Sequence, residues 1–176
     1  LESNSTQLDF QKRLKMLGSP KIVGKEELWV NSISSLVPCL PESCLPIIFQ
    51  LQQEITSESL RAEIIISLIK KESRVDFTPG IIDEIQSFQD ERIKSNLLLK
   101  IVDYLPDSSL NNALRITQTI RSEEWRFQAL QAFIPRLPET ATSLLKHLKA
   151  SKLDWLQAQQ LVSLAPKLPE SSLNDA

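Results

Sequence analysis

The chain has 176 residues, of which 41% are hydrophobic and 24% are charged, and its formal net charge is −2. This length and composition indicate a globular protein the size of one domain rather than a disordered one. Three dispersed glycines exclude the glycine-rich loops that bind dinucleotides or phosphates. With one histidine and two cysteines, the chain has few metal ligands, and we expect neither a metal nor another cofactor.

The two cysteines and the absence of targeting patterns favour a cytoplasmic protein. Cys39 and Cys44 have no further cysteine or histidine nearby, which favours two reduced cysteines over a zinc site or a redox pair. No signal-peptide pattern opens the sequence, and no apolar run reaches the roughly 18 residues of a membrane span.

A pattern of about 32 residues recurs along the chain. Four segments align without gaps, LVPCLPES (36–43), IVDYLPDS (101–108), FIPRLPET (133–140) and LAPKLPES (164–171). Their shared prolines are spaced by 65, 32 and 31 residues, so a unit without the Leu-Pro pair is expected near Ser73. We predict a leading partial repeat and loop over 1–27, then about five repeats over 28–59, 60–92, 93–124, 125–154 and 155–176.

Each unit contains two helical patterns that meet at the Leu-Pro corner. In the unit 125–154, the apolar residues of the first helix fall on one stripe, namely Ala129, Leu130, Phe133, Ile134 and Leu137. The Leu-Pro proline is expected in the first turn of the second helix, followed by an acidic residue that stabilises the positive helix end. Because each helix has one apolar face, we predict an all-α fold, an α-solenoid of stacked two-helix repeats.

The corner segments resemble bacterial HEAT-like or TPR-like repeats with an L-x-P-x-L-P-E signature, and HEAT-like repeats more closely. The helix starts Asp90-Glu91-Arg92 and Ser122-Glu123-Glu124-Trp125-Arg126 fit the same resemblance. The resemblance implies a helical scaffold of the kind found in large multidomain regulatory proteins, often beside signalling ATPase or protease-like modules. The last residues, PESSLNDA, match PDSSLNNA (106–113), so we expect the sequence to be part of a longer protein.

No set of residues predicts catalysis, and we expect a protein that is not an enzyme. His147 has no matching nucleophile and acid, and the pairs Asp90-Glu91 and Glu123-Glu124 are interpreted as acids at helix starts. The leading hypothesis is a protein-interaction, sensor or scaffold segment of a larger intracellular regulatory protein. Its candidate contacts are the polar residues expected to face solvent on the second helices: Gln50, Gln53, Glu54, Asn111, Asn112, Lys146 and Lys149.

Three further hypotheses remain open. Residues 113–168 carry eight Lys and Arg against four acids, so nucleic acid could bind a basic ridge of Arg136, Lys146, Lys149 and Lys167. The array could instead be an inert spacer between domains, and an excised piece could stack end to end.

Tryptophans open three of the first helices, where they are expected to cover the seams between repeats rather than to anchor a partner: Trp29, Trp125 and Trp155.

Overall fold

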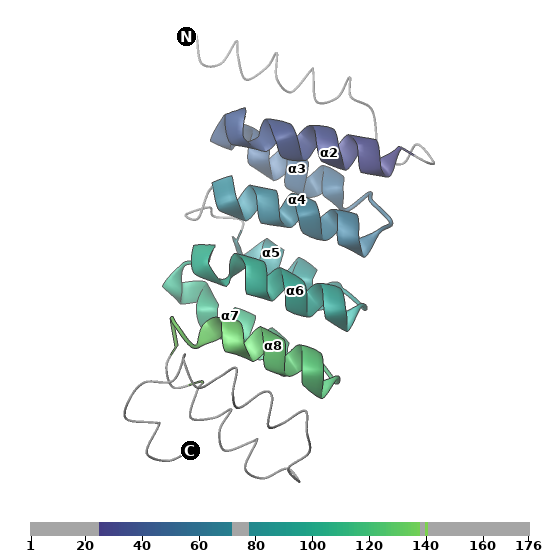
Figure 1. The fold of residues 1–176 in the computed structure, drawn as a ribbon. Helices are drawn as coiled ribbons and strands as arrows, with labels where there is room; N and C mark the ends of the chain where they lie inside the picture. The colour runs from purple at the N-terminus through teal and green to yellow at the C-terminus, as the bar shows by residue number, and fades with distance from the viewer. Residues whose placement is uncertain (1–24, 72–77, 138–139, 141–176) are drawn as a thin grey trace, which may run out of the picture.

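The computed structural model describes residues 25–71, 78–137 and 140, and all regular secondary structure in these ranges is helical (Figure 1). The predicted all-α class is therefore confirmed for this part of the chain. The α-helices are α2 (Glu26–Leu36), α3 (Leu45–Gln52), α4 (Glu58–Lys71), α5 (Thr78–Ser87), α6 (Glu91–Ile101), α7 (Asp107–Thr117) and α8 (Glu123–Phe133). Three short 3-10 helices are η1 (Val37–Cys39), η2 (Glu42–Cys44) and η3 (Val102–Tyr104).

The helices form two layers. In the first, α2, α4, α6 and α8 stack in chain order, each packing on the next; we call this the A layer. Behind it lie α3, α5 and α7, which we call the B layer (Figure 1). The layers are joined because α3 packs on α4, α5 on α6, and α7 on α8. The A-layer helices begin 32, 33 and 32 residues apart, so one structural period separates each pair of neighbours.

Two of the A helices, α2 and α6, end in a 3-10 turn at the Leu-Pro corner. In the first corner η1 follows α2 directly and contains Pro38, and in the third η3 follows α6 although Asp103 stands at the same place. The leucines of the two Leu-Pro pairs, Leu40 and Leu105, are buried. A buried leucine anchors each corner, so the proline within the turn is dispensable.

The Leu-Pro prolines lie one residue earlier than predicted, at the N-cap and not inside the first turn. Pro41 and Pro106 have extended ψ values of 144° and 150°, and their carbonyls accept the first backbone hydrogen bonds of the segments that follow. After Pro41 the B helix is split into η2 and α3. Pro46 explains the split, because it has no N–H to donate to the preceding turn.

Two clusters of buried side chains form the core. One joins α2 and α3 to Ile64 and Leu68 on one face of α4. The other joins Ile65 on a neighbouring stripe of α4 to α5, α6, α7 and α8. α4 therefore has two buried faces, which it presents to the helices on either side.

The first tryptophan fits the prediction for the seams. Trp29 is buried in the cluster that joins α2 to α4, and Trp125 is half-buried against the second cluster. Trp155 lies outside the described residues. Leu36 aligns with Phe133 in the corner segments and so has the spacing of the apolar stripe, but it is 41% exposed. Leu68, at the same position of α4, is buried against the preceding A helix, α2. Leu36 has no preceding A helix among the described residues, because α2 is the first that the structure describes.

A glutamate at the start of three A helices, α2, α4 and α6, binds the link that precedes the next A helix. The Glu26 carboxylate accepts hydrogen bonds from the N–H (3.0 Å) and hydroxyl of Thr56. Glu58 accepts from the N–H groups of Gln89 (2.8 Å) and Asp90 (2.9 Å). Glu91 accepts from those of Arg121 and Ser122, both at 2.9 Å. One contact thus recurs at the same place in three consecutive periods.

The sequence analysis interpreted Glu91 as an acid that stabilises a helix dipole, and the structure gives it, like Glu26 and Glu58, a longer-range role. The carboxylates accept hydrogen bonds from the N–H groups of residues about 30 positions ahead, in the links that lead into α4, α6 and α8. Asp90 and Ser122 in turn cap α6 and α8 with their side chains. Each glutamate therefore fixes the backbone of the link that leads into the next A helix.

The Glu91 contact predicts a local response to acid. The N–H groups of Ser122 and Arg121 favour the carboxylate and lower the pKa of Glu91 below its usual value. The interaction is therefore complete above the usual pKa and is lost as the pH falls through the lowered one. We expect the amide resonances of Arg121 and Ser122 to shift with a midpoint below about pH 4.5 in NMR spectra.

The control for this titration is Glu91→Gln, which has the same shape and no charge to lose. We expect the two amide resonances to show no such transition in that variant. A transition that persists in Glu91→Gln would contradict the assignment of the contact.

Candidate functional site

A groove lies in the B layer between α5 and α7. Its volume is about 460 Å³, and eight residues line it: Ile82, Asp83 and Gln86 from α5, and Asn112, Arg115, Ile116, Gln118 and Thr119 from α7 and its C-terminal turn. We call it the α5–α7 groove. The groove forms where α5 packs directly on α7. α5 also packs on α6, and α7 on α8, so both helices are held against the A layer.

The groove has an apolar floor and polar walls. Ile82 and Ile116 are buried and belong to the same core cluster, so they hold the two helices together beneath the groove. The polar lining residues are all exposed. An acid on one helix, Asp83, and a base on the other, Arg115, share the groove with three amide side chains, those of Gln86, Asn112 and Gln118.

The polar groups of the groove are available to a ligand. Five of its side chains make no hydrogen bond or ion pair within the part of the chain that the structure describes: Asp83, Gln86, Asn112, Arg115 and Gln118. Thr119 differs, because its hydroxyl donates to the Ile116 carbonyl (2.7 Å). The groove can therefore offer one carboxylate, one guanidinium and three amides, which both donate and accept hydrogen bonds.

Of the predicted contact residues that the structure describes, one lies in the groove. Asn112 lines it, whereas Asn111, next in sequence, is exposed on α7 outside the lining. Gln50 and Gln53 are exposed at the C-terminal end of α3. Glu54 is half-buried and so does not fully face solvent as expected. Lys146 and Lys149 lie outside the described residues.

The other lining residues were missed for two different reasons. Arg115 and Thr119 follow Asn112 at helical spacing, so the sequence of α7 alone could have added them to the candidate face. Asp83 and Gln86 come from the unit that lacks the Leu-Pro corner. Without that corner the register of α5 was open, and its groove-facing residues could not be identified.

The basic residues that favoured nucleic acid are partly engaged within the molecule. Arg136 donates to the carbonyls of Val102 (2.8 Å) and Leu105 and pairs with Asp107, which ties one corner to the corner before it. Lys71 makes an equivalent contact, donating to the Pro38 carbonyl (2.7 Å).

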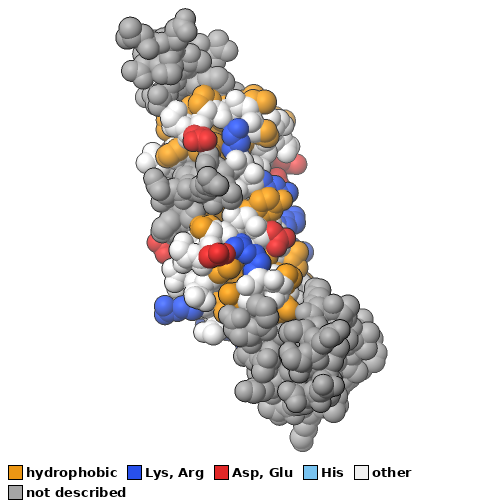
Figure 2. All heavy atoms as spheres, turned by 90° about the vertical axis from the view of Figure 1, so that its left-hand side faces the viewer, with side chains coloured by type: hydrophobic (Ala, Val, Ile, Leu, Met, Phe, Trp, Pro, Cys, Tyr) orange, Lys and Arg blue, Asp and Glu red, His pale blue; other side chains and the backbone are white. Residues whose placement is uncertain are grey.

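Arg126 is the second engaged arginine of this region. It lies 3.9 Å from a carboxylate oxygen of Glu123 and donates to the Ile120 carbonyl. Figure 2 shows the corner edge of the molecule, where basic and acidic side chains of the described residues lie next to one another rather than in a patch of one sign. Lys146, Lys149 and Lys167, the rest of the expected ridge, lie outside the described residues.

The two cysteines are not among the residues that line the groove. Cys39 is exposed and Cys44 buried, and neither forms a disulfide. Burial raises the pKa of the Cys44 thiol, which keeps it protonated. Among the described residues, no three His, Cys, Asp or Glu side chains are grouped as metal ligands. Within the same ranges, no helix has the length and apolar character needed to span a membrane.

Comparison with known proteins does not assign the chain to a family. No protein-family model matches the sequence, and neither a curated protein nor a solved structure shows significant similarity to it.

Proposed function

We propose that the chain is an α-solenoid of HEAT-like two-helix repeats that serves as a non-enzymatic protein-interaction scaffold. The solenoid is supported by the regular spacing of the A helices and by the glutamate contact that recurs in three periods. In such arrays each unit contacts its neighbours, and the stacked helices present an extended surface to partners.

The observation that carries the interaction role is the α5–α7 groove. Its exposed acid, base and amides have no intramolecular partner among the described residues. Gathered in one groove, such a set is suited to polar contacts with another chain. We therefore place the interaction surface on the B layer, with the groove at its centre.

Site-specific photocrosslinking tests this proposal. A photoreactive amino acid replaces Asn111, which is exposed on α7 beside the groove, or Asn96, which is exposed on α6 in the A layer. Both variants of the full chain are irradiated in extract of the source cells. We expect a protein adduct from position 111 that excess unlabelled chain competes away, and none from position 96.

The other outcomes separate the alternatives. Adducts of equal yield from both positions would contradict a B-layer interaction surface. A nucleic-acid adduct would support binding through the basic half of the sequence instead. The absence of any competed adduct from either position would support the inert spacer.

A further inference from the structure

We propose that the α5–α7 groove binds an extended peptide segment that places an acidic side chain on Arg115 and a basic side chain on Asp83. This inference rests on the proposed interaction function and specifies the chemistry of the partner. It is argued from the three kinds of group in the groove: its amides, its apolar floor and its pair of opposite charges.

The amides point to a polypeptide backbone. Gln86, Asn112 and Gln118 each offer one carbonyl oxygen and one NH₂ group, and a peptide unit offers the complementary N–H and C=O. An α-helical partner already uses its backbone groups within the helix, so it leaves none for these amides along its length. An extended segment leaves its backbone groups free, and it is the conformation that matches the groove.

The floor and the volume fit a few residues of such a segment. Ile82 and Ile116 lie at the bottom, where the aliphatic part of a bound side chain can contact them. The volume of about 460 Å³ is within the range of roughly 300–1,000 Å³ that is usual for ligand pockets.

The charges define the side chains of the segment. Arg115 stands on α7 and Asp83 on α5, so a ligand that lies in the groove meets one charge of each sign. A polyanion such as nucleic acid would be attracted by Arg115 but repelled by Asp83. A peptide that carries both an acid and a base can pair with both residues at once.

The test is a charge-swap selection on the full chain. Random short peptides displayed on phage are selected against the wild-type chain, Arg115→Glu and Asp83→Lys. We expect wild-type binders to carry an acid and a base, Arg115→Glu to select a base in place of the acid, and Asp83→Lys an acid in place of the base. By fluorescence anisotropy, each swap should weaken a wild-type binder by about three- to tenfold.

Two matched variants control for a change of net charge. Arg92→Glu and Asp103→Lys alter exposed residues of α6 and η3, outside the groove lining, and should leave the selected motif and the affinities unchanged. Circular dichroism is used to check that all four variants fold.

Motifs that do not change with either swap would overturn the groove proposal. So would a failure to select any peptide while the competed photoadduct from position 111 is still formed, and in that case the interaction function would stand. If neither peptides nor photoadducts are obtained, the groove proposal and the interaction function fail together.

Discussion

Replacing Leu98 by alanine is expected to lower the free energy of unfolding by about 3 kcal/mol. Leu98 of α6 has no exposed surface and shares one core cluster with Ile65 of α4 and Phe133 of α8. Truncation removes apolar contacts and leaves a cavity among helices that cannot fully close around it. Urea unfolding followed by far-ultraviolet circular dichroism measures the change.

The next residue provides the control, because Leu99 carries the same side chain on the solvent-exposed side of the same helix. Leu99 is 46% exposed, and Leu99→Ala is expected to change the free energy of unfolding by about 0.5 kcal/mol or less. Equal losses in the two variants would contradict the two-layer packing around α6.

The apolar stripe of the A helices could be predicted from sequence because it depends on spacing alone. Counting back eight residues from the Leu-Pro proline identifies Ile33, Leu98 and Leu130, and the same count from Ser73 identifies Ile65. Leu130 is half-buried, and the other three are buried. The prediction was wrong at Leu36, which has the right spacing but is exposed. Spacing defines which face of a helix is apolar, whereas burial also requires a neighbour against that face.

The corners were predicted in position but not in detail. The Leu-Pro pairs marked two changes of direction correctly, yet the split of the B helix at Pro46 depends on one missing N–H donor within a sequence that reads as continuous helix. The unit near Ser73 lacks the pair, and its corner lies outside the described residues. Its B helix, α5, supplies one wall of the groove, which is why the sequence identified Asn112 and missed Asp83.

The glutamate contacts could not be predicted from sequence because their partners are backbone N–H groups about 30 residues ahead. A backbone donor leaves no mark in the sequence, and an acid at a helix start is already explained by the helix dipole. Only the stacking of one A helix on the next brings the link within reach. The same holds for Arg136, whose position in a basic stretch suggested phosphate binding and whose guanidinium binds the preceding corner.

Replacing Glu58 by alanine is expected to lower the free energy of unfolding by about 1–2 kcal/mol, less than Leu98→Ala. The Glu58 side chain is 20% exposed, so water compensates for part of what is lost. The variant removes the acceptor of the Gln89 and Asp90 N–H groups, and it also removes the carboxylate 3.8 Å from Arg61. Amide hydrogen exchange at Gln89 and Asp90 should become faster, because their N–H groups lose their acceptor.

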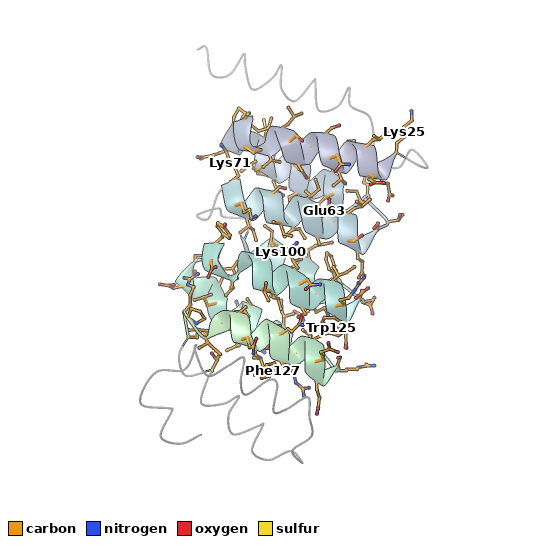
Figure 3. All side chains as sticks on the ribbon, viewed as in Figure 1. Lys25, Glu63, Lys71, Lys100, Trp125 and Phe127 are labelled. Atoms are coloured by element: carbon orange, nitrogen blue, oxygen red, sulfur yellow. The ribbon has the colours of Figure 1, made fainter. Side chains whose placement is uncertain are left out.

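Two variants separate this contact from a general effect of charge. Glu63→Ala removes an exposed carboxylate from the middle of the same helix (Figure 3), and it should leave exchange at Gln89 and Asp90 unchanged. Glu58→Gln keeps one carbonyl acceptor and should be intermediate between the wild-type chain and Glu58→Ala. If Glu58→Ala behaved like Glu63→Ala, the glutamate would not fix the link. If it loosened α6 as well, the contact would couple neighbouring units: Asp90, whose N–H the glutamate holds, is the residue whose side chain caps α6.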